Sequence, residues 1–315
     1  MKQDRRSLPR PGKDLVDQGL AFDVDTLLSR RKMFHVLGIG AATVGLAACA
    51  GRSGTAPGPS SSSSAGAIAA QGEIPDETAG PYPGDGSNGP DVLDESGIVR
   101  SDIRSSLGAA SGTADGVPMT LELTITDLAN GGRPFEGAAV YVWHCDREGR
   151  YSLYSQGIEE QNYLRGVQIA DGTGKVRYTS IFPACYNGRW PHIHFEVYPD
   201  QASVTDSTNA IATSQVALPK DVCDVVYRQS GYERSATNLA QITLDSDNVF
   251  GDDGGATQLA TVSGDIASGY TVTLAVGIDT GTAPVRGQLN GDGAPSGAPP
   301  GGPPPGGARL NRSAS

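Results

Sequence analysis

The segment from about residue 73 to residue 280 is built from short apolar stretches that are separated by turns. Leu121, Leu123 and Ile125 alternate with polar residues, which predicts a strand with one buried face. No long segment keeps the 3.6-residue period of an amphipathic helix. Together with turns rich in Gly and Pro, this pattern is typical of an all-β chain folded as an antiparallel β-sandwich. Further strands are expected at residues 139–143, 176–181, 193–198, 212–218, 240–244, 259–262 and 270–278, and a short helix near 218–227.

The segment before this domain, residues 1–49, has the composition of an export signal. Arg30 and Arg31 precede a mildly apolar run over 36–46, as in twin-arginine secretion signals. The run is too short for a permanent membrane span. It ends at Cys49 in the sequence LAAC, which resembles a bacterial lipoprotein signal cleaved before a lipidated cysteine. An ordinary signal cut nearby, without a lipid, is the alternative. We therefore expect the protein outside the cytoplasm, touching the membrane only through a lipid anchor.

The remaining segments surround the expected sandwich at residues 73–280. Residues 50–72 are rich in Ser, Gly, Pro and Ala and predict a flexible linker, and residues 281–315 are rich in Gly and Pro and predict a disordered tail. The formal net charge of the chain is −11. An acidic balance argues against nucleic acid as a partner, because binding to phosphates needs a basic surface.

Two of the four histidines in the chain lie two residues apart, in the sequence Trp190-Pro191-His192-Ile193-His194. On a strand, alternate side chains share a face, so His192 and His194 are expected to lie side by side. Neutral imidazole is the commonest metal ligand in proteins. Tyr186 lies six residues earlier and offers an anionic oxygen, and Arg189 places a cation nearby. The sequence therefore predicts a metal site on a strand and on the loop before it.

These residues resemble the iron-binding segment of intradiol ring-cleavage dioxygenases, the family of the catechol and protocatechuate dioxygenases. In that family a Tyr, an Arg three residues before the first His, and an H-x-H pair recur in this order. The family's earlier tyrosine ligand follows a Trp-bearing strand in a G-x-Y sequence, and Gly149-Arg150-Tyr151 after Trp143 matches it. The resemblance covers about residues 74–278 and implies a β-sandwich catalytic domain, without the helical dimerisation region of catechol dioxygenases.

The resemblance implies that Tyr151, Tyr186, His192 and His194 bind Fe(III). It implies further that both oxygens of a catechol-type ring bind the metal, and that Tyr186 is released as a base. Both atoms of O₂ then enter the ring, which opens between the hydroxylated carbons to a muconate-type diacid. Arg189 is expected to stabilise negative charge on the ring.

The same resemblance gives weaker indications for contacts with the substrate, a small aromatic diol. The sequence Thr78-Ala79-Gly80-Pro81-Tyr82 is similar to a segment that lines the substrate pocket in protocatechuate dioxygenases. It implies substrate contacts for Gly80, Pro81 and Tyr82, although the sequence is equally typical of a plain turn. Gln215 matches a family glutamine near the substrate. His144 is expected to be a hydrogen-bonded core residue, and Trp143 to pack behind the ligands.

Three cysteines remain after Cys49, and export to an oxidising compartment favours a disulfide among them. A bond between Cys185 and Cys223 is the first expectation, with Cys145 as the remaining thiol. Three alternatives to the ferric site stay open: a zinc hydrolase, a site with cysteine ligands, and a non-catalytic β-sandwich that binds a phenolic ligand or a partner. A site with two histidines and one carboxylate would favour Fe(II), but the motif contains no carboxylate.

Overall fold

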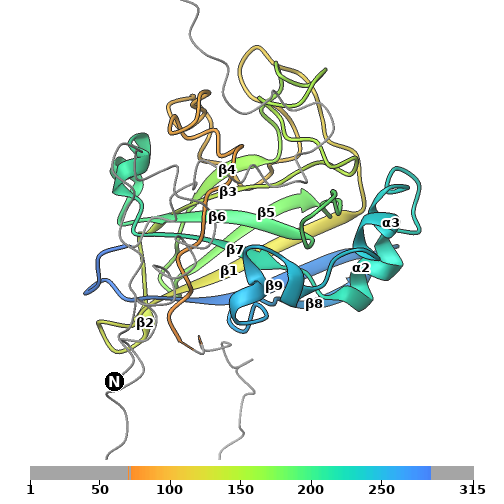
Figure 1. Cartoon of the computed structure of the whole chain (residues 1–315). Helices are drawn as coiled ribbons and strands as arrows, with labels where there is room; N and C mark the ends of the chain where they lie inside the picture. The colour runs from red at the N-terminus through yellow and green to blue at the C-terminus, as the bar shows by residue number, and fades with distance from the viewer. Residues whose placement is uncertain (1–69, 71, 285–315) are drawn as a thin grey trace, which may run out of the picture. The chain divides into compact units, whose positions relative to one another are not determined.

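The computed structural model of the chain describes residues 70 and 72–284. Two sheets pack face to face in this part of the chain (Figure 1). The predicted export signal, Cys49, most of the linker and most of the C-terminal tail lie outside the described residues, so these assignments and the domain boundaries stay predictions. Among the residues described, no helix combines the length and the hydrophobicity that a membrane span requires.

One sheet has five strands, and the other has four. The first runs in the order β2-β1-β9-β8, with β5 also paired to β1. The second runs in the order β4-β3-β6-β7. The strands of the first sheet are β1 (Pro118–Asp127), β2 (Arg133–Pro134), β5 (Lys175–Ile181), β8 (Thr261–Asp265) and β9 (Gly269–Ile278), and those of the second are β3 (Ala139–Trp143), β4 (Arg165–Ile169), β6 (His192–Tyr198) and β7 (Ala212–Ala217).

The expectation of an antiparallel β-sandwich is confirmed, with one exception in the pairing. Strands β1 and β9 lie side by side and run parallel, although nearly the whole domain separates them in sequence (Figure 1). Every other pair of named strands is antiparallel. The parallel pair brings the first and last long strands together in the middle of one sheet, so the two ends of the domain stabilise each other.

The core between the sheets follows the two-residue period of the strands. Met119, Leu121, Leu123 and Ile125 of β1 are buried, while the residues between them are half-buried. The facing strands contribute Val140 and Val142 from β3 and Ile193, Phe195 and Val197 from β6. Strand β6 is buried along its whole length, so its other face must be covered as well. A second apolar cluster covers that face, with residues from loops 79–107 and 151–154 packed on Tyr141 and Trp143.

Short helices cover the ends of the sandwich. Helix α2 (Lys220–Val226) confirms the helix expected near 218–227, and α3 (Ser235–Leu239) lies beside it (Figure 1). Four 3₁₀ helices complete the described elements: η2 (Gln201–Thr205), η3 (Ser207–Asn209), η4 (Leu244–Ser246) and η5 (Phe250–Asp252).

The strand expected at residues 240–244 is wrong. Ala240 ends α3, and Thr243 caps η4 through a reciprocal pair of hydrogen bonds with Ser246. Local hydrogen bonds of this kind compete with a sheet ladder, and here they outweigh the β-propensity of Ile242 and Thr243. The strand expected at 259–262 begins later, at Thr261, because Leu259 forms only an isolated bridge to Ala217. The sequence patterns also missed β2 and β4.

A fully buried arginine on β4 fastens two loops to the outer face of the second sheet. Arg165 donates from Nε to Ser152 Oγ, from Nη1 to Pro83 O and Tyr141 Oη, and from Nη2 to Tyr82 O and Ser152 O. These bonds use all five donors of the guanidinium. Gly84 is part of this arrangement, because a Cβ there would lie 2.7 Å from Arg165 Nη1 and its φ of +68° favours glycine. Arg165 therefore ties residues 82–84 to the loop that follows Tyr151.

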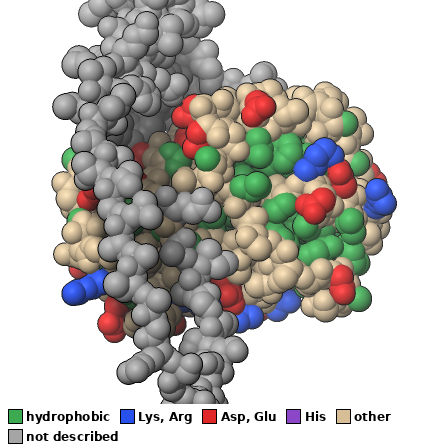
Figure 2. Space-filling model, turned by 90° about the horizontal axis from the view of Figure 1, so that it is seen from below, with side chains coloured by type: hydrophobic (Ala, Val, Ile, Leu, Met, Phe, Trp, Pro, Cys, Tyr) green, Lys and Arg blue, Asp and Glu red, His purple; other side chains and the backbone are tan. Residues whose placement is uncertain are grey.

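All three histidines of the described residues are buried, and none is visible on the face drawn in Figure 2, where acidic and basic side chains are scattered among uncharged ones. His144 follows β3 and is satisfied at both ring nitrogens, as expected for a core residue. Its Nδ1 lies 2.8 Å from Cys145 O, and its Nε2 lies 2.7 Å from Ser180 Oγ. Burial lowers the pKa of His144 from 6.5 to about 4.

Replacing Arg165 with Met should destabilise the fold, because three buried carbonyls and two hydroxyls would lose a donor. We expect the free energy of unfolding to fall by about 3 kcal/mol or more, since each buried unsatisfied polar group costs roughly 1–3 kcal/mol. Urea denaturation measures the change. Arg177→Met is the matched control, because Arg177 is exposed and bonds only to Glu122 at the surface. Equal stability of the two variants would show that Arg165 does not fasten these loops.

The buried neutral state of His144 should make the metal-free protein less stable in acid. The folded-state pKa lies below the unfolded value, so the unfolded chain binds the extra proton and stability is lost as the pH falls below about 6.5. Between pH 7 and pH 5 this group contributes a loss of about 2 kcal/mol. Urea denaturation at both pH values should show this loss in the wild type and a smaller total loss in His144→Gln. An equal pH dependence in both proteins would contradict the assignment.

Candidate metal centre

Strand β6 divides its side chains between the core and the candidate site. Ile193, Phe195 and Val197 enter the core between the sheets, so His192 and His194 project from the opposite face. Trp143, the residue opposite His194 on β3, stacks on its ring with the centroids 4.8 Å apart and the planes at 6°. This contact confirms the expected packing position of Trp143 and fixes the plane of the His194 imidazole.

The two imidazoles and the phenol of Tyr186 converge on one point. His192 Nε2 lies 3.0 Å from His194 Nε2 and 3.2 Å from Tyr186 Oη. His192 Nδ1 lies 2.5 Å from the carbonyl of Trp190, so the proton resides on Nδ1 and the lone pair of Nε2 faces the other two atoms. A backbone carbonyl that fixes the tautomer in this way is typical of metal-binding histidines.

Tyr151 completes the cluster from the loop after β3. Its ring lies edge-on to Tyr186 and His194, with centroid distances of 6.0 and 6.1 Å. Its Oη is buried and close enough to the Tyr186 phenol to act on its pKa, but no hydrogen bond of good geometry to the described residues satisfies it. A buried hydroxyl without a partner is costly and calls for an unseen ligand. The structure thus brings together Tyr151, Tyr186, His192 and His194, the four metal ligands predicted from the sequence.

Two loops hold the tyrosines in place. Before Tyr151, the side chain of Asp146 accepts hydrogen bonds from the backbone N–H groups of Glu148 and Arg150 and closes a tight turn. Gly149 in this turn has a φ of +85°, and a Cβ there would lie 3.2 Å from Tyr186 Cβ. The glycine therefore lets the two ligand loops approach each other. On the other side, α3 holds Cys185, the residue before Tyr186, because Ser235 Oγ accepts from its N–H and Asn238 Nδ2 donates to its carbonyl.

The environment holds all four side chains neutral in the absence of a cation. Burial raises the pKa of both Tyr151 and Tyr186 well above the usual value, although Arg189 opposes the rise at Tyr186. Burial and the charge of Arg189 lower the pKa of His192 to about 3, and burial lowers that of His194 further below its usual range. A bound cation would offset the cost of ionising the buried phenols, because it stabilises phenolate. The neutral imidazoles already offer a lone pair to a cation.

The spacing of these atoms fits one metal ion. Adjacent ligands at right angles, each about 2.1 Å from a first-row ion, lie about 3 Å apart, and the nitrogen and oxygen atoms around His192 Nε2 are spaced by 3.0 and 3.2 Å. In the described residues no group of three or more His, Cys, Asp or Glu side chains is arranged to hold a metal. The donor set of the candidate centre is therefore two imidazoles and two phenols, and hard phenolate oxygens favour Fe(III).

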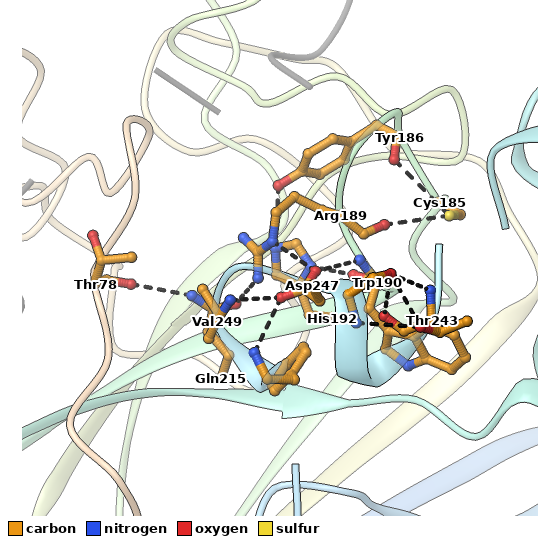
Figure 3. Close-up of polar contacts among 12 residues, drawn as sticks. Thr78, Cys185, Tyr186, Arg189, Trp190, His192, Gln215, Thr243, Asp247 and Val249 are labelled. Atoms are coloured by element: carbon orange, nitrogen blue, oxygen red, sulfur yellow. Dashed lines mark hydrogen bonds and ion pairs between the residues drawn. The ribbon is translucent and has the colours of Figure 1, made fainter. Parts of the chain in front are cut away.

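Arg189 lies beside this cluster, in the loop between Tyr186 and His192. It is buried, donates from Nε to Asp247 at 3.0 Å, and donates from Nη2 to Gln215 Oε1 at 2.6 Å (Figure 3). The ion pair of Arg189 with Asp247 is therefore buried and does not lie at the surface. Its charge acts on both phenols and both imidazoles of the cluster.

Three of the four residues predicted to contact substrate lie next to a candidate ligand. Gly80 has a φ of +74°, and a Cβ there would lie 3.4 Å from His194 Cε1. Tyr82 stacks on Tyr151 with the ring centroids 5.1 Å apart. Gln215 pairs with His194 across the β6–β7 ladder. Pro81 lies between Gly80 and Tyr82 and is half-buried. Their contact with a substrate stays a prediction.

A cavity of about 460 Å³ opens beside Tyr186. Tyr186 is also the most exposed of the four candidate ligands, at 8 % against 1–3 % for the others. The volume lies within the range of small-molecule pockets. Its lining includes Asn187, Arg147, Arg234 and Asn238. Of the four candidate ligands, only Tyr186 lines this cavity.

The disulfide expected between Cys185 and Cys223 is wrong. All three described cysteines are free and buried. The thiol of Cys145 faces the carbonyl of Ala184 at 3.6 Å, and that of Cys185 faces the carbonyl of Arg189 at 3.5 Å. Burial raises the pKa of each thiol, to about 12 for Cys185, so the thiols remain protonated and act as small apolar residues. The ligand loops are fixed by hydrogen bonds to α3 and to the turn at Asp146.

Sequence patterns missed three residues that shape the site. Asp247 binds Arg189, Phe250 lies under its guanidinium at 6.0 Å, and the carbonyl of Thr78 accepts from Gln215. No motif marks Asp247, which is one of three aspartates between residues 245 and 252. Its partner lies 58 positions away, so only the folded chain identifies it.

Comparison with known proteins gives local sequence matches and a match of the fold. A family model described as "Dioxygenase" matches residues 88–193, which include Tyr151, Tyr186 and His192, and stops one residue before His194. The catechol 1,2-dioxygenase of Pseudomonas sp. (strain EST1001) is 39% identical over 72 residues, and the chlorocatechol 1,2-dioxygenase of Rhodococcus opacus is 36% identical over 55 residues. These alignments cover 23% and 18% of this chain, and 23% and 21% of the two relatives.

Among solved structures, an intradiol ring-cleavage dioxygenase from Tetranychus urticae has a TM-score of 0.51 at 22% identity. The superposition covers 67% of this chain and 96% of that one, so the two share the fold of the domain. The local sequence matches fall in the family of the catechol dioxygenases, and the fold agrees with them. The chain is thus similar to the dioxygenase family over residues 88–193, and its described domain shares the fold of an intradiol ring-cleavage dioxygenase.

Proposed function

We propose that this chain is an Fe(III)-dependent dioxygenase that cleaves a catechol-type ring between its two hydroxylated carbons. The proposal depends on one observation above all: His192 Nε2 lies within 3.2 Å of both His194 Nε2 and Tyr186 Oη, and the buried phenol of Tyr151 lies edge-on to the rings of Tyr186 and His194. A ferric ion held there would act as a Lewis acid toward the two oxygens of the diol and toward the electrons of the ring. Both atoms of O₂ would enter the product, a muconate-type diacid.

The residues of the chain prepare the substrate for this chemistry. Tyr186 is the candidate base, because burial raises the pKa of its phenol well above the usual value once its oxygen is free. A phenolate released in such a place takes a proton readily from a bound catechol hydroxyl. Tyr186 lies in the loop before β6 and lines a cavity, so its side chain can move without disturbing the strand. Tyr151, at 1 % exposure and packed under Tyr82, is the fixed phenolate.

Arg189 supplies positive charge at the place where negative charge develops on the ring. It is 4 % exposed, so water screens its charge little. Gln215 and Asp247 hold its orientation before the substrate arrives, which avoids reorganisation during the reaction. Gly80, next to His194, and Tyr82, stacked on Tyr151, are candidate walls of the substrate site.

The export signal and the lipidation of Cys49 are part of the proposal. They place the enzyme outside the cytoplasm, tethered to the membrane through residues 50–72, and they are supported by the sequence of residues 1–49. Aromatic diols would then meet the enzyme before entering the cell. A β-sandwich module that binds a phenolic ligand without turnover is the alternative, and a zinc hydrolase is a further one.

Iron loading should colour the protein, because phenolate bound to Fe(III) absorbs visible light by charge transfer. We expect Tyr186→Phe to weaken and shift the band and His194→Ala to abolish it together with most of the bound iron. Tyr163→Phe is the matched control, since Tyr163 is a buried phenol in the same loop as Tyr151 and lies in a different cluster. Absorption spectra and metal analysis give the result. A colourless protein that purifies with zinc would support the hydrolase alternative.

Oxygen consumption decides between turnover and binding. A panel of catechol, carboxylated, chlorinated and hydroxylated catechols should include at least one substrate that consumes one O₂ per ring. With ¹⁸O₂, both labelled atoms should appear in the diacid. An oxygen electrode and mass spectrometry of the product provide the measurement. Protein that is coloured, binds catechols and consumes no oxygen would be the non-catalytic module.

A further inference from the structure

Asp247 makes an unusual number of contacts for a residue in a loop. Its side chain is fully buried, and Oδ2 accepts from Arg189 Nε at 3.0 Å and from the backbone N–H of Trp190 at 2.7 Å (Figure 3). Its other oxygen, Oδ1, accepts from the N–H groups of Val249 and Phe250 at 2.8 and 3.1 Å. One carboxylate therefore joins the ligand loop at 189–190 to the segment that leads into η5.

The guanidinium of Arg189 is held from a second side by β7. Gln215 accepts from Nη2 at 2.6 Å, and its own amide donates to the carbonyl of Thr78 at 3.1 Å. Figure 3 shows Asp247 and Gln215 meeting different nitrogens of Arg189, while Tyr186 and His192 lie next to it. The neutral amide of Gln215 orients Nη2, and the charged carboxylate of Asp247 orients Nε. The plane of the guanidinium is thus defined by two partners from distant parts of the chain.

The charge balance explains why a carboxylate is present. Arg189 is buried beside two imidazoles that burial keeps neutral, so its charge needs a counterion. Burial alone would raise the pKa of Asp247, but the charge and hydrogen bonds of Arg189 and the Trp190 N–H lower it below the usual value. Asp247 is therefore ionised, and Arg189 keeps its proton.

We propose that Asp247 is a positioning residue, which holds the guanidinium of Arg189 at the candidate centre and acts on ring cleavage only through Arg189. The inference rests on the proposed function for its effect on rate. It concerns Asp247, the acid to which Arg189 donates its Nε hydrogen bond, whereas Asp245 is exposed and Asp253 accepts from Gly255 and Ala256.

Asp247→Asn in the iron-loaded enzyme tests the proposal. The amide keeps the shape of the side chain but removes its charge and one set of acceptor positions. We expect kcat to fall about 10²-fold, the size seen when one group that stabilises developing charge is lost. The iron content and the visible band should be unchanged, because no ligand is touched. Asp245→Asn removes an equal charge two residues away and should leave kcat unchanged.

A double-mutant cycle separates positioning from a structural role. If Asp247 acts through Arg189, Asp247→Asn should cost nothing further in an Arg189→Ala background. Losses in kcat that multiply would overturn the proposal. Asp247→Glu keeps the charge and displaces it by one methylene, so it should retain more activity than Asp247→Asn; it also serves as the test if the Asn variant does not fold. Equal activity of the Glu and Asn variants would contradict the role of the charge.

A crystal structure of Asp247→Asn makes the test independent of turnover. The guanidinium of Arg189 should be displaced or adopt more than one conformation, with His192 and His194 in place. An unmoved guanidinium would overturn the positioning role even if the enzyme is active. Absence of oxygen uptake by the wild type would instead refute the proposed function, and the displacement of Arg189 would still decide whether Asp247 holds it.

Discussion

The two-residue alternation along β6 couples the hydrophobic core to the candidate metal centre. Ile193, Phe195 and Val197 are fully buried between the sheets, and this burial fixes the register and direction of the strand. A shift by one residue would turn the histidines into the core and the apolar residues out of it. Packing on the core face of β6 therefore fixes the position of His192 and His194 on its other face. The loops then only have to bring the phenols of Tyr151 and Tyr186 to the two imidazoles.

Burial of the centre makes a cation part of its stability. Two phenols and two imidazoles are packed against one another and buried, and each is neutral in that environment. The unpartnered Oη of Tyr151 has a cost in the metal-free protein that a bound ion would remove. An ion bound in the proposed site would therefore couple metal binding to the stability of the fold.

Most of the correct predictions came from residues that lie close together in the sequence. The H-x-H pair, Tyr186 and Arg189 lie within nine residues, and strand periodicity alone places the histidines on one face. The sequence did not predict features that depend on residues far apart in the chain. The pairing of β1 with β9, the bonds of Arg165 to Tyr82 and Pro83, and the contact of Asp247 with Arg189 each join residues 58 or more positions apart. The disulfide prediction failed because it was inferred from the expected compartment and not from geometry.

The two buried arginines next to the centre show how the same side chain serves different purposes. Arg165 directs five donors at carbonyl and hydroxyl oxygens, so its hydrogen-bonding capacity is used within the fold. The hydrogen bonds of Arg189 to Asp247 and Gln215 use Nε and Nη2, and its charge is felt by all four candidate ligands. A carboxylate and an amide thus fix the orientation of this guanidinium beside the donor cluster. Arg165 fastens the loops over the sheet, and Arg189 places a positive charge beside the candidate metal centre.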